Sequence, residues 1–557
     1  MPIVLGVLAL FLATQYGRAL SLPFISDDYV ILEKTSRSSF LRLWSTSDLL
    51  FGWYRPWSRE LHYWVLQRLV GLRPLLYHLT SFGLWLAVMA LYAVLVRDLR
   101  GLRVSLVATA AVAAAAAWGA PLLWVASAQE LWMLLFSLLA LLAFHRGRPA
   151  WSTAFVALAL LSKETAAGLP ALALAHAWWI KRRPLARAFL ESAPWWGGLG
   201  VWAAAHPVLG ERLFHPEFGI AERASRPATL LLWGKTMLAW VNLETWPRPS
   251  GGWPNALLAG LPGVVLLGGL AAFGASLASP PRTEPERPGD AKRRPNPVAF
   301  ATAWAIVGSL PLIVPSIGWH SYYGLWGALG AWMALAGLVA ARRALAIGLV
   351  AALALLRSVF AETPSWDRST EIFQLRAAFF MRLMSESLAD LYPRLPSHAR
   401  LYFARVPRDV GFTAGNGFAL RLWYRDSTLR AGYYSEYEPR RRDEPAGRDY
   451  FFRYDSVRTW VEVVHGAEDV ASGRAANPRW EGDHRDLARL LGMKADWSGA
   501  ASEFAKLAAA APANPEYAVN LAYCLERGGD SLAAALWFAR ADSLRNTTSQ
   551  RKSARAP

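Results

Sequence analysis

Long apolar stretches without charged residues are the feature that most limits how this chain can fold. Residues 104–120 and 344–356 contain no Asp, Glu, Lys or Arg. Such runs are typical of helices that cross a lipid bilayer, and they are too apolar for the surface helices of a water-soluble domain. Since 54% of the 557 residues are hydrophobic and only 18% are charged, we expect a polytopic α-helical membrane protein.

Hydropathy in a window of about 19 residues predicts about eleven transmembrane helices. These candidate spans lie near residues 2–22, 74–96, 104–121, 123–144, 150–162, 166–181, 187–207, 255–278, 298–317, 321–341 and 344–361.

Basic clusters follow every second span, and they predict the orientation. They comprise Arg97, Arg100 and Arg103; Arg146 and Arg148; Lys181, Arg182, Arg183 and Arg187; the basic residues of 282–294; and Arg342 with Arg343. Positively charged loops stay in the cytoplasm. We therefore expect a cytoplasmic N-terminus and everything after about residue 362 on the exterior side. The expected location is the bacterial inner membrane.

The net charge of +18 does not require a nucleic-acid partner. Residues 1–361 carry 31 Lys and Arg against 16 Asp and Glu, a balance of +15, whereas the remainder carries 28 against 25, or +3. The excess lies in the membrane half, where orientation explains it. The single cysteine, Cys524, excludes a disulfide framework and a multi-cysteine zinc site.

Composition predicts three parts. Residues 1–361 form a membrane domain with two long exterior loops, 23–73 and 207–254, and a cytoplasmic linker, 279–297, that is rich in Pro, Arg and Glu. Long loops at a membrane surface are typical of functional regions. In the first loop, Leu61, Trp64, Val65 and Leu69 share one face of a predicted interfacial helix.

Residues 362–483 form the second part, which we expect to be an exterior α/β or α+β module. A helix over 366–392 precedes four predicted strands, at 400–406, 419–424, 450–454 and 459–464.

Residues 484–557 form the third part, a short helical repeat. Four positions recur 34 residues later, with Gly529 in a turn; the pairs are Leu487 and Leu521, Ala500 and Ala534, Phe504 and Phe538, Pro512 and Asn546. This is the tetratricopeptide (TPR) period. Two repeats are too few for a free-standing array, so we expect them to pack on a neighbour or on a partner protein.

Asp27 and Asp28 follow the first span directly. Adjacent carboxylates repel one another unless a cation or a shared proton compensates. They are candidates for a general base acting on an acceptor hydroxyl, or for metal ligands. The alternative is an ordinary helix cap, because Ser26 and Asp27 are common cap residues.

Cationic side chains suited to a phosphate occur at two other places. Arg55, in the string Tyr54-Arg55-Pro56-Trp57, could hold a phosphate in a two-pronged contact, although Tyr, Arg and Trp also anchor loops at a membrane interface. Lys163 lies in a short exterior turn, against the orientation rule, with Glu164 beside it as its partner or a separate ligand. Lys163 is a candidate for anion binding or for contact with lipid headgroups.

Three further residues complete the candidate set. Glu130 lies near the exterior end of the fourth span, and His320 and Tyr323 lie in another exterior turn. His320 is a candidate for metal or phosphate binding, or for an interfacial role only. Because all of these residues are expected on the same face, we predict that they form one site.

The order and sidedness of these strings resemble the GT-C integral-membrane glycosyltransferases. The resemblance covers about residues 1–361 and rests on Asp27-Asp28, Tyr54-Arg55-Pro56, Pro74-Leu75-Leu76-Tyr77-His78 and Ser162-Lys163-Glu164. It is strongest to bacterial relatives of protein O-mannosyltransferases and to the transmembrane-and-TPR O-mannosyltransferases. Two strings depart from that pattern: no His follows on the second helix, and His320-Ser321-Tyr322-Tyr323 replaces an Arg-Tyr pair.

The resemblance implies inverting transfer of a monosaccharide from a polyprenyl-phosphate donor on the exterior face. It implies Asp27 or Asp28 as base or metal ligand, Arg55 and Lys163 at the donor phosphate, and Glu164 in support. Tyr54, Glu130, His320 and Tyr323 are further supporting candidates. A divalent cation bound by Asp27, Asp28 and His320 is the only cofactor that we expect.

The acceptor could be a protein, a lipid or a glycan. Two other classes stay open: a transporter or flippase of lipid-linked substrates, and a non-catalytic membrane scaffold that uses its helical repeats.

Overall fold

A computed structural model describes residues 1–207, 226–277, 295–310, 319–365, 367, 370–407 and 417–553. The chain divides into two compact units, Met1–Ala378 and Phe379–Pro557, called here the N-terminal and C-terminal units. Most of the predicted linker 279–297 and part of the predicted loop 207–254 lie outside the described residues.

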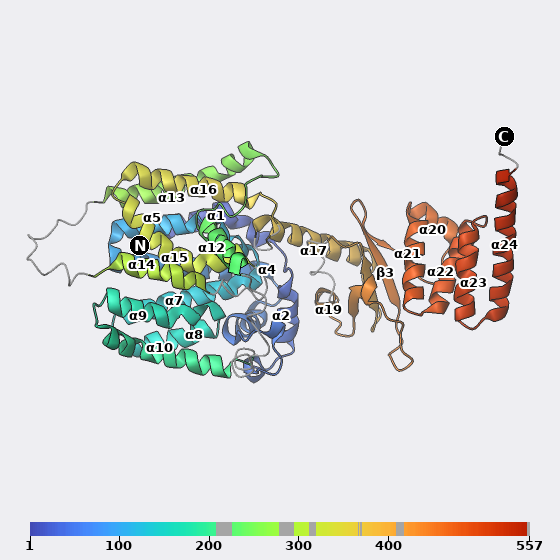
Figure 1. Cartoon of the computed structure of the whole chain (residues 1–557), viewed down its shortest axis with the longest axis horizontal. Coiled ribbons are helices and arrows are strands. Elements are labelled where there is room, and N and C mark those ends of the chain that lie inside the picture. Colours follow the sequence, from blue (N-terminus) through green and yellow to red (C-terminus); the bar gives the residue numbers. More distant parts are fainter. Residues whose placement is uncertain are drawn as a thin grey trace, which may run out of the picture. The chain divides into compact units, whose positions relative to one another are not determined.

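The described part of the N-terminal unit is helical (Figure 1). Helices α7 to α10 lie together on one side of the unit and α13 and α16 on the other. The helices and short helical turns are α1 (Pro2–Tyr16), η1 (Gly17–Ser21), α2 (Asp27–Ser36), η2 (Leu41–Trp44), η3 (Leu50–Gly52), η4 (Pro56–Leu61), α3 (His62–Val70), α4 (Pro74–Arg100), α5 (Leu102–Ala113), η5 (Ala116–Trp118), α6 (Gly119–Leu123), η6 (Val125–Ser127), α7 (Ala128–His145), α8 (Pro149–Leu160), η7 (Glu164–Gly168), α9 (Leu169–Trp179), α10 (Leu185–Ala205), α12 (Arg226–Trp240), α13 (Trp253–Ser276), α14 (Pro297–Ser309), η11 (Ser321–Gly324), α15 (Leu325–Val339) and α16 (Arg343–Ala361). Helix α17 (Glu371–Leu391) begins in this unit.

The structure gives a helix at each of the eleven predicted spans, but the number that could cross a membrane is smaller. Among the described residues, six helices are long and apolar enough, or seven if the bent pair α5 and α6 counts as one. Helices α8 and α14 are apolar but short, and α10 contains Pro194. The predicted count of eleven is therefore not confirmed, because apolar composition alone does not give a helix the length to span a bilayer.

Close backbone contact joins α14 to α15. A Cβ atom added to Gly308 would lie 2.6 Å from the backbone nitrogen of Gly327, and one added to Gly330 would lie 2.5 Å from that of Ala305. Small residues at such positions let apolar helices approach closely where no hydrophobic effect drives them together.

The backbone groups at the break between α5 and α6 form hydrogen bonds with a side chain that follows α12. The buried Asn242 donates to the carbonyls of Ala114 and Leu353 and accepts from the backbone nitrogen of Ala116. Backbone groups freed by a helix break must find such partners inside a membrane. The 60° bend is therefore a fixed corner of the unit.

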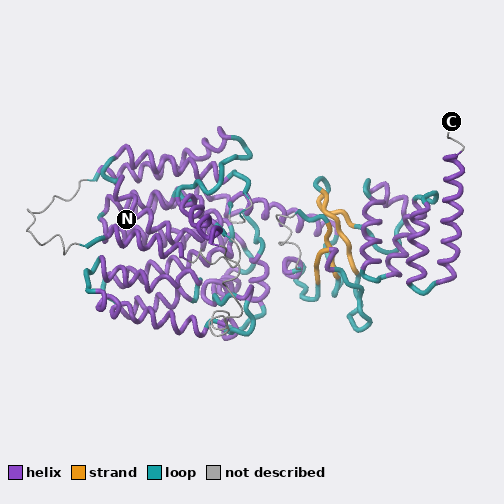
Figure 2. Tube along the Cα trace, viewed as in Figure 1, coloured by secondary structure: helices purple, strands orange, loops and turns teal. Residues whose placement is uncertain are grey.

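The C-terminal unit contains all the strands of the described chain (Figure 2). Its mixed sheet has the order β2-β1-β3-β4, with β1 (Arg400–Ala404) parallel to β2 (Arg430–Tyr433) and β3 (Asp449–Asp455), and β4 (Thr459–Glu462) antiparallel to β3. Three predicted strands are confirmed. The predicted strand at 419–424 is wrong, because these residues form helix α19 (Phe418–Trp423), and β2 was not predicted.

Helices follow the sheet as α20 (Val470–Ala476), α21 (Trp480–Met493), α22 (Trp497–Ala510), α23 (Pro515–Arg527) and α24 (Ser531–Ser553). Gly529, with φ of 93°, lies in the turn before α24, a conformation that favours glycine. The pair α21 and α22 is followed by the pair α23 and α24, which fits the predicted period of 34 residues. Membership of the TPR class stays a prediction.

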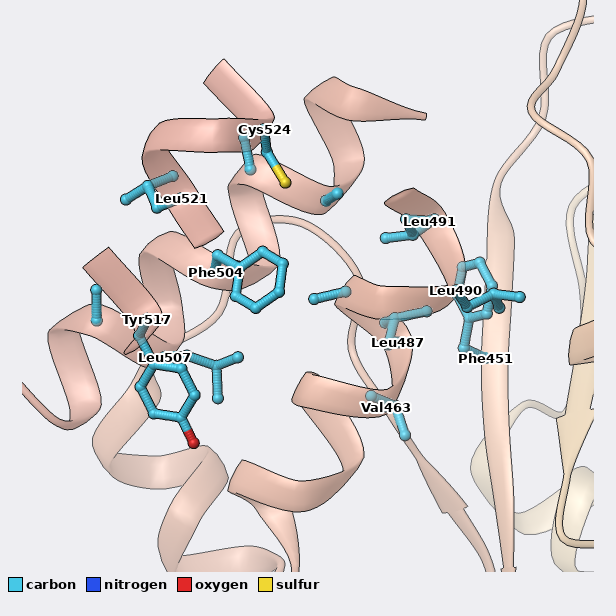
Figure 3. Packing of buried hydrophobic residues seen from close by; sticks show 14 of the residues in the cluster. Phe451, Val463, Leu487, Leu490, Leu491, Phe504, Leu507, Tyr517, Leu521 and Cys524 are labelled. Carbon is cyan, nitrogen blue, oxygen red and sulfur yellow. The ribbon is translucent and has the colours of Figure 1, made fainter. Parts of the chain in front are cut away.

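Sheet and helices share one core (Figure 3). Phe451 comes from β3 and Val463 directly follows β4, while Leu487, Phe504 and Leu521 come from three successive helices; all are at most 5% exposed. The predicted boundary at 483/484 falls inside α21, so residues on its two sides contribute to the same packing.

Candidate functional site

Asp28 is a buried, fully bonded carboxylate at the start of α2. Its Oδ2 accepts the backbone N–H of Ile25 at 2.9 Å, and its Oδ1 accepts the Tyr63 hydroxyl at 2.6 Å and the backbone N–H of Ala126 at 2.8 Å. Burial raises the pKa of Asp28 to about 7, against the lowering effect of these donors. Neighbouring Asp27 is only half-buried, so sequence neighbours have different environments.

Arg55 holds Glu164 in a two-pronged ion pair. Its Nε lies 3.0 and 2.9 Å from the two carboxylate oxygens, and its Nη2 lies 2.6 Å from Oε2. Its Nη1 donates to Gln129 Oε1 at 2.9 Å. Burial alone would lower the pKa of Arg55, but Glu164 raises it above its ordinary value. Arg55 in turn lowers the pKa of Glu164 against the opposite effect of burial.

Lys163 forms the second ion pair, with Glu130. Its Nζ donates to Glu130 Oε2 and lies 4.8 and 4.6 Å from the ring centres of Tyr322 and Tyr323. Burial lowers the pKa of Lys163, and Glu130 opposes this effect. Glu130 is 1% exposed, and its Oε1 accepts no hydrogen bond from any residue that the structure describes.

A chain of hydrogen bonds joins Asp28 to the ion pairs. Asp28 holds the backbone N–H of Ala126 in η6, the Ala126 carbonyl accepts from Gln129 Nε2 at 2.7 Å, and Gln129 accepts from Arg55. Glu130 is the next residue after Gln129. Asp28 therefore fixes the short turn from which both Gln129 and Glu130 reach their cations.

The first loop is bonded to the turn that carries Lys163. The backbone N–H of Trp57 donates to the Leu161 carbonyl at 3.3 Å, and Ser58 Oγ donates to the Ser162 carbonyl at 2.6 Å. Both bonds start from η4, a π-helical turn, a feature frequent at functional sites. The loop and the turn together hold Arg55 and Lys163 beside each other.

A buried ion pair braces the same loop from within. Arg59 donates to Glu60 Oε1 at 2.6 Å and to the carbonyls of Leu50 and Trp53, and Lys34 Nζ lies 3.4 Å from Glu60. Helix α3 leaves Val65 and Leu69 exposed, and its position at a membrane surface stays a prediction.

His320 is oriented by a carboxylate. Its Nδ1 lies 2.7 Å from Asp367 Oδ1, while the backbone N–H of Ser321 donates to Asp367 Oδ2 at 3.2 Å. The imidazole lies 5.7 and 5.3 Å from the rings of Tyr322 and Tyr323.

Tyr54 is the remaining predicted residue. Its hydroxyl donates to the Trp44 carbonyl, and its ring contacts His206. His206 Nε2 lies 4.0 Å from Glu164 Oε1. Tyr54 therefore lies next to the site through His206.

The predicted metal set does not form a cation site. No three His, Cys, Asp or Glu side chains are grouped as a metal would require within the described ranges. Both oxygens of Asp28 already accept N–H or O–H donors, and His320 Nδ1 is bonded to Asp367. A cation requirement stays a prediction, and it would need ligands other than this set.

The structure thus brings together Arg55, Lys163, Glu164, Glu130 and Tyr323 from four separate segments. The sequence did not predict the pairing, in which each cation takes the carboxylate of a different segment. Gln129 and Asp367 were missed as site residues. Gln129 precedes Glu130 and had a sequence signal in its position at a helix start, whereas Asp367 had none.

Comparisons with solved structures give a distant likeness. Crystal structures of ArnT from Cupriavidus metallidurans, in the apo state and bound to undecaprenyl phosphate, resemble the chain with TM-scores of 0.37 and 0.36 and identities of 16% and 17%. The likeness covers 73% of this chain and 83% of the apo chain, and 77% and 84% for the bound one. A likeness at this level does not define a family or an activity. No protein-family model matches the chain, and no curated protein matches it.

Proposed function

We propose that the protein is a membrane glycosyltransferase of the GT-C type that uses a polyprenyl-phosphate-linked sugar. It transfers the sugar, with inversion, to an acceptor hydroxyl or amine on the exterior face of the membrane. The observation that carries the proposal is the meeting of two cations from separate segments, the buried Lys163 and the half-buried Arg55. The GT-C resemblance of the sequence supports it.

The two cations suit a lipid phosphate because their carboxylate partners can be exchanged. A phosphate oxygen offers the same acceptor geometry to a guanidinium as a carboxylate does. Glu130, which has one oxygen without a donor among the described residues, and Glu164 keep the cations in place and balance their charge until the donor arrives. Developing negative charge on the leaving phosphate is then met by donors that are already oriented.

Of the two aspartates, we assign the base to Asp27. A base must touch the acceptor, and Asp27 is half-buried, whereas Asp28 is 0% exposed and accepts three hydrogen bonds. Asp28 serves as a positioning residue for η6 and Gln129.

Separate measurements of donor binding and transfer in nanodiscs test the proposal. Asp27→Asn keeps the size of the side chain but removes the proton acceptor, so transfer should fall about 100-fold or more while donor affinity stays unchanged. Arg55→Gln should weaken binding of the polyprenyl-phosphate sugar. Wild-type binding in Arg55→Gln and in Lys163→Gln alike would dismiss the phosphate site.

The bent pair α5 and α6 favours one alternative, a transporter of lipid-linked substrates, because transporters use broken helices. Asn242 forms hydrogen bonds with the backbone at the break, however, and the ion pairs of Arg55 and Lys163 lie elsewhere. A flippase would move a fluorescent polyprenyl-phosphate lipid across vesicles without releasing a transferred sugar, and that result would favour this alternative.

The helical repeat of the C-terminal unit is proposed as a platform for the acceptor or a partner protein. Removing residues 484–557 would expose the core shared with the sheet, so point variants are the better test. Leu532 and Leu536 of α24 are 79% and 67% exposed. Replacing both with Gln should impair use of the acceptor and leave donor binding unchanged.

A further inference from the structure

The dyad of His320 and Asp367 has the arrangement of an acid–base pair. Asp367 accepts from the backbone N–H of Ser321 through one oxygen and faces His320 Nδ1 through the other, at 2.7 Å. A carboxylate can only accept, so the Nδ1 atom carries the proton, and Nε2 is the nitrogen directed to other groups. The His320 side chain is 19% exposed and that of Asp367 is 5% exposed.

The imidazole lies beside the proposed phosphate site. Tyr323 separates His320 from Lys163: its ring centre is 5.3 Å from the imidazole and 4.6 Å from Lys163 Nζ. Tyr322 lies almost parallel to the imidazole, at an interplanar angle of 10°. Among the residues that the structure describes, charged groups near the dyad include Glu244, which interacts with Asp367, and Lys235, whose Nζ lies 4.0 Å from the Trp319 ring.

The charge balance of the site calls for a proton donor. The Arg55–Glu164 and Lys163–Glu130 pairs are each neutral in sum. A polyprenyl-phosphate sugar carries one negative charge, and its leaving group would carry two unless it gains a proton. A phosphate monoester and an imidazole hold a proton with similar strength near neutral pH, so a histidine is suited to this transfer.

We propose that His320, oriented by Asp367, protonates the polyprenyl phosphate as it leaves; this rests on the proposed glycosyl transfer. The bond between the anomeric carbon and the phosphate oxygen breaks, its electron pair stays on that oxygen, and the Nε2 proton of the imidazolium moves there. The acceptor oxygen or nitrogen bonds to the anomeric carbon and loses its proton to Asp27. Water then returns a proton to His320 and removes one from Asp27.

His320→Ala and Asp367→Asn test the assignment in the full-length protein in nanodiscs. His320→Ala should lower transfer about 100-fold or more and change donor affinity by less than about threefold. Added imidazole should restore transfer in proportion to its concentration. Asp367→Asn keeps the imidazole but removes the carboxylate that balances the imidazolium charge, so transfer should fall while donor affinity stays unchanged.

His145→Ala is the matched control, since His145 contacts only His176 among the described histidines, and imidazole should not change its rate. The proposal is overturned if His320→Ala transfers at the wild-type rate. It is also overturned if His320→Ala loses transfer without rescue by imidazole and Asp367→Asn transfers at the wild-type rate. Failure of the wild type to bind or transfer the lipid-linked sugar would instead reject the proposed function itself.

Discussion

Two buried ionic clusters, one in each unit, differ in how completely their carboxylates are satisfied. In the C-terminal unit, Glu503 is 0% exposed, and its oxygens accept from His465 at 2.9 Å, His484 at 2.6 Å and Lys506 at 3.1 Å. In the N-terminal unit, Glu130 pairs with Lys163 through one oxygen only, within the described residues.

This difference in hydrogen bonding indicates that the two ionic clusters have different roles. A buried network whose members are all bonded stabilises a single packing arrangement, and here it links the end of the sheet to α21 and α22. A buried carboxylate with an oxygen left over is destabilising, and such groups cluster where a ligand is bound or a reaction occurs. We interpret the Glu503 cluster as structural and the Lys163–Glu130 pair as functional.

The largest expected effect comes from breaking the functional pair. Lys163→Met leaves the buried Glu130 carboxylate without its cation, which should cost about 3–5 kcal/mol of unfolding free energy. Glu130→Gln in the same chain should restore most of this stability but not donor binding. Thermal unfolding in detergent and donor titration measure the two effects. A double variant that binds the donor normally would contradict the functional interpretation.

The structural cluster should appear as an acid sensitivity of the C-terminal unit. Its hydrogen-bonding partners lower the pKa of Glu503 to about 2, against the effect of burial. The folded-state value is below the unfolded one, so the stabilisation is full above about pH 4.5 and is lost as the pH falls toward 2, by about 3 kcal/mol. Hydrogen exchange of the α22 amides measures it. Glu503→Gln should remove this pH dependence and leave donor binding unchanged; an equal slope in both proteins would contradict the assignment.

A smaller effect sharpens the comparison within the site. Arg55→Lys keeps the charge but cannot form the two-pronged contact, so donor affinity should fall about tenfold, or about 1.4 kcal/mol. Arg68→Lys is the matched control, because Arg68 is exposed in the same loop and contacts Trp64. Donor titration that gave equal affinities for both variants would show that Arg55 acts as a simple charge.

The smallest effect belongs to an exposed pair of the C-terminal unit. Arg405 and Asp486 lie 2.8 Å apart, and both side chains are 44% exposed. Exposed pairs contribute about 0–1 kcal/mol, so Arg405→Gln should hardly change hydrogen exchange in α21. A loss of hydrogen-exchange protection as large as that in Glu503→Gln would mean that burial does not distinguish the exposed Arg405–Asp486 pair from the buried Glu503 cluster.

The sequence predicted helix positions well, because continuous apolar runs are a strong local signal. It failed where the signal was short. Residues 419–424 mix Leu, Trp and Tyr with Arg in a pattern that fits a strand or one and a half helical turns, and they fold as α19. Strand β2 contains Ala and Gly, and its pairing with β1 comes from distant residues.

The expected exterior position of the loops indicated which residues could lie near one another. It did not indicate which of them form ion pairs. The sequence treats Asp27 and Asp28 alike, and only the fold buries one of them. Similarly, Glu164 is adjacent to Lys163 in sequence, yet its partner is Arg55. Tertiary packing decides such contacts, so no local pattern could have revealed them.

The bonds between the first loop and the turn at Lys163 also set the timing of assembly during synthesis. Arg55 and Glu164 are 109 residues apart, so a ribosome that adds about 5–20 residues per second makes Glu164 about 5–20 s after Arg55. Until then Arg55 has no carboxylate from that turn. The contacts among Arg59, Glu60 and Lys34 use residues of the loop alone, so they can hold the loop in shape while the later helices form.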